Sequence, residues 1–235
     1  MIFHHHKTIY YHIGKTAGSS MEYWLWPGMP TSHEPRRSLM WGKDTEKGMW
    51  LQHATPNETA AIAGEKYVDE YFNFTIVRNP FTRLISVYHY QKDTHDQKFG
   101  GFIGFIDELY NLHKSENLLM HPHYMPQVNY VYRNGKPTCD YIGYFEKLPR
   151  STTYLSRKLG IKHKFPRLNT SRFTPEQSVY SAIRENSILE KIVEIYNDDF
   201  EVFGYSRSPD DVRVKKAKLP LRRPNRMSIL YKIFG

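Results

Sequence analysis

Short apolar runs of strand character alternate along this chain with segments that carry helix start and stop signals. The strand candidates are residues 8–13 (TIYYHI), 73–77 (NFTIV) and 140–143 (DYIG), which are rich in β-branched and aromatic side chains. Strands that alternate with helices form parallel sheets, because a helix makes the crossover between neighbouring strands. We therefore predict an α/β fold, a single domain with a central, mostly parallel sheet flanked by helices on both faces.

Helix boundaries are marked by capping residues, prolines and glycines. Helices are predicted over residues 21–26, 80–92, 102–112 and 148–159, the last of them closed by Gly160. Three capping boxes each open a further helix: Thr55-Pro-Asn-Glu58, Thr174-Pro-Glu-Gln177 and Ser187-Ile-Leu-Glu190. Residues 28–50 have no clear period, and we expect them to form a long surface excursion.

The size of the chain limits how many domains it can form, and its charge limits the kind of partner it favours. With 235 residues, of which 40% are hydrophobic, the chain can bury one substantial core, and we predict one domain over residues 1–206. Residues 207–235 form a basic, proline-punctuated tail. The net charge of +9 favours an anionic partner, such as a nucleotide, a nucleic acid, an anionic membrane or an acidic glycan.

The sequence also bears on location. It contains no run of 18 apolar residues and no stretch with the character of a secretory signal, so we expect a soluble, cytoplasmic protein. Cys139 is the only cysteine, which rules out an intramolecular disulfide. In the tail, residues 227–234 (MSILYKIF) are compatible with a small amphipathic foot for peripheral membrane contact.

The first strand candidate runs straight into a turn of small residues with one lysine. Small residues let the backbone curl so that successive N–H groups point into one hollow, and the following helix adds the partial positive charge of its N-terminus. Lys15 supplies a full charge, and hydroxyl groups supply further donors. The predicted phosphate-binding residues are Gly14, Lys15, Thr16, Ala17, Gly18, Ser19 and Ser20.

A Walker A loop is the obvious alternative, but the spacing does not match. That loop needs a glycine five residues before Gly14, where Ile9 stands inside the strand candidate. The second strand candidate ends at Val77-Arg78 and offers no terminal aspartate to hold magnesium. A nucleotide kinase or NTPase is therefore disfavoured. A basic nucleic-acid-binding protein is a further alternative, although the usual recognition motifs are missing.

The second strand candidate leads into another turn that suits phosphate. Arg78 stands at the carboxyl end of the strand, Asn79 can cap the next helix, and Pro80 can begin it. Arg83 and Ser86 follow on that helix, and a guanidinium with a hydroxyl is a good pair for a terminal phosphate. The alternative for Arg83, pairing with a nearby acid, stays open.

Together these two turns resemble the 5′-phosphosulfate loop and the 3′-phosphate motif of sulfotransferases that use 3′-phosphoadenosine 5′-phosphosulfate (PAPS). The resemblance is strongest to the carbohydrate branch, sulfotransferase family 2, which contains the chondroitin and dermatan enzymes and bacterial relatives. Four further stretches resemble elements of that branch in the same order: His53-Ala-Thr55, His123-Tyr-Met-Pro-Gln127, Asp140-Tyr-Ile-Gly-Tyr-Phe-Glu-Lys-Leu148 and Asp199-Phe-Glu-Val-Phe-Gly-Tyr205. The resemblance spans residues 8–205 and implies a P-loop-like sulfotransferase fold.

The chain departs from the family pattern at several points. Gly14 stands where many relatives have proline, and Tyr124 stands where they have tryptophan. The membrane anchor and the disulfide cysteines of the Golgi members have no counterpart, which makes a Golgi-lumenal location less expected than a cytoplasmic one.

The resemblance implies in-line transfer of a sulfuryl group from PAPS to a hydroxyl acceptor, on a glycan or glycoconjugate, with PAP as the product and without a metal. Lys15 would stabilise the charge that develops on the leaving phosphate. His53 is the candidate general base, although a purely local packing role for it stays open. His123 and Glu58 are the next candidates for the base. The expected substrate contacts are His123, Gln127 and Glu58, and Arg172 is a further 3′-phosphate candidate.

Overall fold

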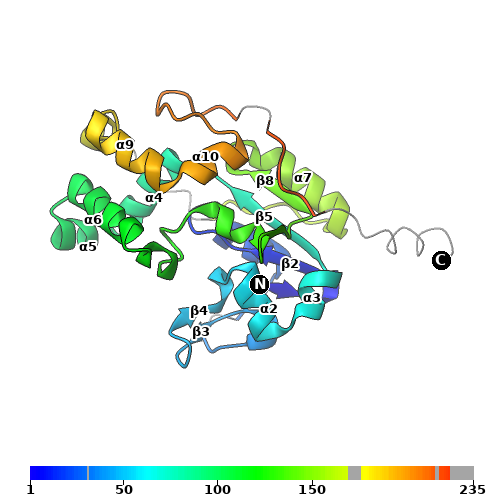
Figure 1. Cartoon of the computed structure of the whole chain (residues 1–235). Helices are drawn as coiled ribbons and strands as arrows, with labels where there is room; N and C mark the ends of the chain where they lie inside the picture. Colours follow the sequence, from blue (N-terminus) through cyan, green and yellow to red (C-terminus); the bar gives the residue numbers. More distant parts are fainter. Residues whose placement is uncertain (31, 169–175, 215–216, 223–235) are drawn as a thin grey trace.

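The computed structural model describes residues 1–30, 32–168, 176–214 and 217–222 (Figure 1). At its centre lies a four-stranded sheet in the order β1-β2-β5-β8, formed by Ile2–Phe3, Thr8–Tyr11, Phe72–Val77 and Tyr141–Tyr144. Strands β2, β5 and β8 are parallel, and β1 is antiparallel to β2. The predicted α/β fold with a mostly parallel sheet is therefore confirmed.

The register of the sheet brings the ends of the parallel strands together. Tyr11 pairs with Thr75, and Val77 pairs with Tyr144. The segments that follow β2, β5 and β8 therefore leave the sheet at one edge, its carboxyl edge. In open α/β sheets this is the edge where ligands bind.

Side chains alternate across the strands and divide the core into two layers. Tyr10, Phe74 and Ile76 face one layer, which is covered by α1 (Gly18–Leu25) and α7 (Leu148–Leu159). The other face packs on the larger cluster of buried side chains. Helices that contribute to this cluster are α2 (Pro56–Ala63), α3 (Glu65–Glu70), α4 (Pro80–Tyr90), α6 (Phe102–Lys114), α8 (Gln177–Ala182), α9 (Asn186–Ile195) and α10 (Asn197–Phe203). The sheet is thus covered on both faces, as predicted.

Several predicted helix ends are confirmed by their capping geometry. Thr55 and Glu58 form the expected capping box at the start of α2. At the start of α4, Oδ1 of Asn79 accepts hydrogen bonds from the backbone N–H groups of Phe81 and Thr82. Helix α7 ends at Leu159, where Gly160 adopts the left-handed conformation that closes a helix.

Other local predictions need correction. Helix α9 begins at Asn186 with no side-chain cap, so the box predicted from Ser187 does not form. The box predicted from Thr174 falls outside the described residues. The 28–50 region is not only a surface excursion, because Met40 and Trp41 are buried and a small antiparallel sheet forms there from β3 (Lys43–Asp44) and β4 (Met49–Trp50).

Short elements complete the described fold. The predicted 80–92 helix is two helices in the structure, because α4 ends at Tyr90 and α5 (Lys92–Phe99) follows. A hairpin is formed by β6 (Tyr132–Arg133) and β7 (Lys136–Pro137). The remaining short helical turns are η1 (His4–His6), η2 (Arg37–Leu39), η3 (Leu51–His53), η4 (Asn117–Met120), η5 (Gln127–Tyr130) and η6 (Phe145–Lys147). Among the described residues, no helix combines the length and apolarity needed to span a bilayer.

Part of the predicted tail is docked on the domain through Arg222. Its guanidinium donates to both carboxylate oxygens of Asp140, at 2.9 and 2.7 Å, and to the backbone carbonyls of Val68, Asp69 and Tyr71. These partners precede β5 and β8, so the contact lies at the amino edge of the sheet, opposite the carboxyl edge.

We expect Arg222→Ala to lower the free energy of unfolding by roughly 2–3 kcal/mol, because it removes charge-assisted hydrogen bonds and leaves the Asp140 carboxylate without its arginine partner. Urea denaturation followed by circular dichroism would measure the change. Arg213→Ala is the matched control: its side chain is 86% exposed, and its solvent-screened ion pair with Asp211 should contribute little to stability. Equal stability of Arg222→Ala and wild type would show that the docked tail does not stabilise the domain.

Candidate functional site

The loop after β2 lies at the carboxyl edge of the sheet and leads directly into α1. Lys15 and Ala17 both adopt the left-handed backbone conformation, with φ of 67° and 70°. Such residues curl a loop so that its N–H groups point to one side, at a cost of about 1–2 kcal/mol each when they are not glycine. Helix α1 begins at Gly18 without any side-chain cap. The N–H groups of its first turn therefore remain available to an anion.

A buried contact between His12 and Glu22 joins the end of the first parallel strand to α1. Nδ1 of His12 lies 2.7 Å from Oε1 of Glu22, which stands one turn along α1 from Gly18. A Cβ placed on Gly18 would lie 1.6 Å from Nε2 of His12, so only glycine lets the imidazole pack against the helix start. Burial acts to raise the pKa of Glu22, but the contact with His12 lowers it overall. The pair thus holds the strand end and the helix together.

The three hydroxyls predicted to bind phosphate have different surroundings. Thr16 is fully buried, and its Oγ1 donates to the carbonyl of Ile13 at 2.8 Å. Oγ of Ser20 accepts from the N–H of Leu168 at 3.0 Å. Oγ of Ser20 also donates to the carbonyl of Leu168 at 3.3 Å, so both hydroxyls bond to protein backbone atoms in this structure, and the backbone N–H groups of Thr16 and Ser20 stay part of the predicted loop. Ser19 is exposed on the first turn of α1.

Arg78 follows the last residue of β5, and its side chain reaches the loop. Its Nη1 donates to the carbonyl of Lys15 at 3.0 Å, and its Nε donates to Oγ1 of Thr82 at 3.1 Å. Its guanidinium carbon lies 4.3 Å from the ring centroid of Phe145. A guanidinium has five N–H donors, so these two bonds leave three for a ligand. The lysine turn and the arginine turn are therefore in direct contact.

Lys15 and Arg78 bring two positive charges close together, and the carboxylate of Glu146 acts on Arg78 in the opposite sense. Burial, and then repulsion by Arg78, lowers the pKa of Lys15 to about 8. Burial is also the main reason that the pKa of Arg78 falls to about 10. Nζ of Lys15 lies 3.8 Å from the ring centroid of Tyr90, on the last turn of α4. A bound anion would favour the charged form of both side chains.

Arg83 has a structural role that the sequence did not predict. It is 2% exposed and donates to the backbone carbonyls of Gly14, Met125 and His123 at 3.3, 3.1 and 3.0 Å. These three contacts go to backbone carbonyls and not to an acid, so they do not support the ion-pair interpretation of this residue. Ser86 is half-buried and stands four residues after Thr82, hence on the helix face where Thr82 meets Arg78.

Three histidines cluster beside the loop. The ring centroid of His53 lies 4.4 Å from that of His12 and 4.8 Å from that of His123. Nδ1 of His53 lies 3.0 Å from the carbonyl oxygen of His12, and a carbonyl can only accept, so Nδ1 carries the proton and Nε2 presents a lone pair. Burial, and then the neighbouring His12 and His123, holds the pKa of His53 well below its usual value. Burial likewise lowers the pKa of His123 to about 4.

Glu58 is less suited to proton transfer. Its Oε2 accepts from the N–H and the Oγ1 of Thr55, at 2.7 and 2.8 Å, as part of the helix cap. It also lines a cavity of about 600 Å³ together with Thr55 and Met125. Thr55 follows His53 by two residues, and Met125 follows His123 by two residues. Two residues of chain span at most about 7 Å, so the backbone of these lining residues lies within that distance of the backbone of the two histidines.

Two further predicted site residues need comment. Gln127 is fully buried, and its amide is bonded to backbone atoms of Arg78 and to Asp199, so it does not contact an acceptor. This corrects its assignment as a substrate contact. Arg172 falls outside the described residues.

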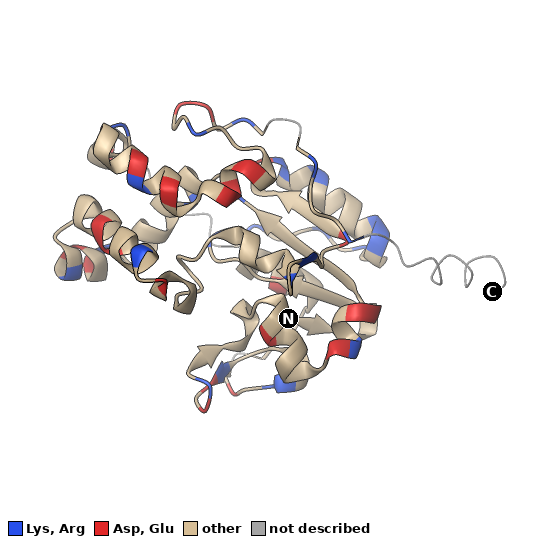
Figure 2. Cartoon of the chain, viewed as in Figure 1, with Lys and Arg blue, Asp and Glu red and all other residues tan. Residues whose placement is uncertain are grey.

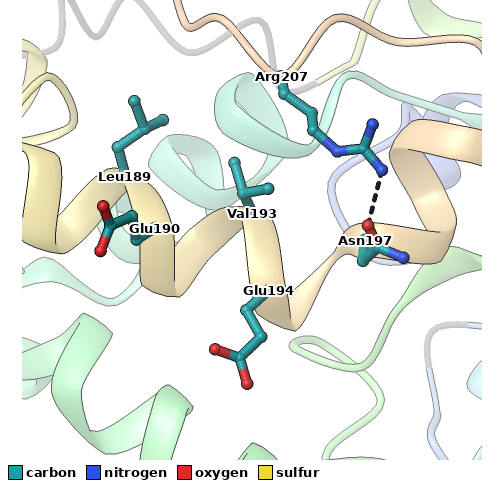
Figure 3. A pocket seen from close by; sticks show the side chains of 6 residues that line it. All are labelled: Leu189, Glu190, Val193, Glu194, Asn197 and Arg207. Atoms are coloured by element: carbon teal, nitrogen blue, oxygen red, sulfur yellow. Dashed lines mark hydrogen bonds between the residues drawn. The ribbon is translucent and has the colours of Figure 1, made fainter.

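A second cavity, of about 540 Å³, lies away from these turns (Figure 3). Helix α9, the start of α10 and Arg207 form its wall, and Arg207 donates to Oδ1 of Asn197 at 2.7 Å. The lining residues are Leu189, Glu190, Val193, Glu194, Asn197 and Arg207. None of them belongs to the two turns or the histidine cluster, so this cavity is not part of the candidate site.

One stretch of the described chain is basic throughout. Between Lys147 and Arg167 the sequence has seven basic and no acidic residues, and Figure 2 shows them on α7 and the segment after it. That segment runs beside α1, because Nε1 of Trp24 donates to the carbonyl of His163 and Leu168 binds Ser20. This basic stretch therefore comes close to the helix that follows the predicted phosphate-binding loop.

Metal ligands are not grouped in the described part of the chain. No set of three or more His, Cys, Asp or Glu side chains there is arranged to hold a metal ion.

Sequence comparisons agree with this arrangement. A family model described as "Sulfotransferase family" matches residues 1–206. An uncharacterised protein of Archaeoglobus fulgidus is 30% identical over 110 residues, which is 46% of this chain and 84% of that protein. The comparison with solved structures found no significant match.

The site residues that the sequence did not predict position the two turns and do not face the space where a ligand would bind. The His12–Glu22 pair has no motif signal, because its ten-residue spacing becomes a contact only when the loop folds back. Glu146, Asp199 and Tyr205 stand in stretches that carried the family resemblance, and their own roles were not predicted.

Proposed function

The chain belongs to the sulfotransferase family, and from this premise we propose that it transfers the sulfuryl group of PAPS to a hydroxyl group of a carbohydrate. The observation that carries the proposal is the 3.0 Å contact between the Arg78 guanidinium and the backbone of Lys15. It joins two cationic turns that are 63 residues apart in the sequence. A nucleotide with phosphates on both the 5′ and 3′ positions can use both turns at once.

The described residues fit such a nucleotide. The N–H groups at the start of α1 and Nζ of Lys15 would hold the 5′-phosphosulfate, and the free N–H groups of Arg78 with Ser86 would hold the 3′-phosphate. Burial lowers the pKa of Lys15 and of Arg78, which disfavours their charged forms. A bound anion would offset this effect and relieve the repulsion between the two side chains, which supports anion binding here.

Bound PAPS would supply an activated sulfuryl group with a phosphate as the leaving group. Lys15 and the N–H groups of the loop would stabilise negative charge on that phosphate. His53, with its free Nε2, would accept the proton of the acceptor hydroxyl, and the His12 carbonyl keeps its ring in the required tautomer. His123 is the second candidate for this base, because its ring contacts that of His53.

A carbohydrate acceptor is supported by the chemistry of the 600 Å³ cavity near the histidines. Its wall carries carboxylates, amides and a tyrosine, all of which form hydrogen bonds with hydroxyl groups. The polar lining residues are Thr55, Asn57, Glu58, Asn129, Tyr132, Asn134 and Asp198.

Transfer assays with labelled PAPS would test the proposal directly. We expect the protein, in excess chelator, to transfer label to at least one member of a panel of glycans and small alcohols, and to bind PAP under the same conditions. Magnesium-dependent ATP hydrolysis without PAP binding would instead support the nucleotide kinase or NTPase alternative. Tight, salt-sensitive DNA or RNA binding without PAP binding would support the nucleic-acid alternative.

A further inference from the structure

The side-chain amide of Gln127 pairs with both backbone polar groups of Arg78. Its Oε1 accepts from the N–H of Arg78 at 2.9 Å, and its Nε2 donates to the carbonyl of Arg78 at 2.8 Å. Two such bonds to one residue are the pattern of a hydrogen-bonded pair between antiparallel strands. Strand β5 ends at Val77, so the Gln127 amide satisfies both backbone polar groups of the first residue after the strand.

Asp199 fixes the direction of that amide. Its Oδ2 accepts from Nε2 and from the backbone N–H of Gln127, both at 3.0 Å, and its Oδ1 accepts from the N–H of Val128 at 2.9 Å. A carboxylate only accepts, so the NH₂ end of the amide must face Asp199 and the oxygen must face the Arg78 N–H. Gln127 and Asp199 are both fully buried.

The next backbone group is held in the same way from another part of the chain. Oε1 of Glu146 accepts from the N–H of Asn79 at 2.7 Å, and Oε2 of Glu146 accepts from the hydroxyl of Tyr205 at 3.0 Å. Phe145, beside Glu146, supports the face of the Arg78 guanidinium. Three segments that are distant in sequence therefore converge on the Arg78–Asn79 peptide.

We infer that Gln127, Asp199, Glu146 and Tyr205 form a socket of positioning residues that aims Arg78 at the 3′-phosphate. The inference rests on the proposed function, because it takes Arg78 as the ligand of that phosphate. The hydrogen bonds of these side chains go to protein atoms at or behind the turn, so the socket acts through Arg78. It explains why three of the stretches that resemble the sulfotransferase family lie outside both nucleotide-binding turns.

The socket has a signature that a general loss of stability would not produce. PAP and 5′-AMP differ only in the 3′-phosphate, so the ratio of their dissociation constants isolates what the proposed 3′-phosphate site, Arg78 with Ser86, contributes. We expect wild type to bind PAP about 10- to 100-fold more tightly than 5′-AMP, the range for charge-assisted contacts. Gln127→Met, which keeps the volume but removes the amide, should lose most of this ratio while binding 5′-AMP as wild type does.

Glu146 provides a pair of variants that separates hydrogen bonding from packing. Glu146→Gln retains an oxygen for the Asn79 N–H and should keep the ratio, whereas Glu146→Leu should lose it. Tyr205→Phe removes only the hydroxyl that holds Glu146 and should reduce the ratio by a smaller factor. If Gln127→Met does not fold, the Glu146 pair and Tyr205→Phe decide by the same criterion.

Arg78→Ala separates the failure of the socket from the failure of the proposed function. A wild-type protein with no preference for PAP over 5′-AMP would contradict the proposed nucleotide. A second outcome would overturn the socket alone. In it, wild type prefers PAP, Arg78→Ala abolishes this preference, and folded Gln127→Met and Glu146→Leu both retain it. Equal loss of PAP and 5′-AMP affinity in the socket variants would likewise overturn it, because the effect would then be structural.

Discussion

Lys15→Ala and Arg78→Ala are each expected to abolish the thermal stabilisation that PAP gives to the wild-type protein. At about one hundred times its dissociation constant, a ligand stabilises the native state by about 2.7 kcal/mol, which raises the melting temperature of a chain of this size by several degrees. Each variant removes a cation from one of the two turns that meet at the Lys15 carbonyl. Differential scanning fluorimetry with and without PAP would measure the shift.

The matched controls are Lys98→Ala and Arg36→Ala, which remove exposed cations outside the two turns and should leave the shift unchanged. Lys15→Ala should also remove the pH dependence of PAP affinity that the Lys15 side chain causes. Since the pKa of Lys15 is about 8 without ligand, and a bound anion would raise it, wild-type affinity for PAP should fall as the pH rises through 8. If both turn variants were stabilised by PAP like wild type, the assignment of the two turns would be wrong.

His53→Ala should bind PAP nearly as wild type does and should lose sulfuryl transfer by about 100-fold or more, the usual contribution of a general base. His53→Gln tests the same point with less change in side-chain volume, because the glutamine amide cannot take up a proton. Initial rates at saturating PAPS, beside the dissociation constant for PAP, separate the two effects. His121→Ala, an exposed histidine outside the cluster, is the control.

The pH profile of transfer gives a further check on this base. Burial lowers the pKa of His53, so the side chain is neutral and able to accept a proton well below pH 6.5. Transfer should therefore hold on the acidic side and fall only as the pH drops through that lowered pKa. Normal turnover in His53→Gln would move the role to His123, whose neutral ring is its neighbour.

How much the sequence predicted depended on whether the signal was local. The strands at 72–77 and 141–144, the cap at Asn79 and the end of α7 at Gly160 all carry their cause in neighbouring residues, and each was predicted to within a residue or two. Strands of two residues, such as β1 and β3, carry no periodicity and were missed.

Side-chain roles were harder to predict, because residue type alone does not tell a ligand contact from a structural one. Arg83 and Gln127 both have the chemistry of ligand-binding residues. The fold buries them against backbone carbonyls and the Arg78 peptide, which only the packing of α4 against distant segments could reveal. The sequence likewise carried no sign that the hydroxyls of Thr16 and Ser20 bond to backbone atoms of Ile13 and Leu168.

The central proposal is that both turns hold one nucleotide. A crystal structure of the protein with PAP would test this directly. We predict the 5′-phosphate at the N–H groups of Gly18–Ser20 beside Lys15, and the 3′-phosphate within hydrogen-bond distance of the Arg78 guanidinium. PAP bound with neither phosphate at these groups, or held elsewhere on the molecule, would contradict the account.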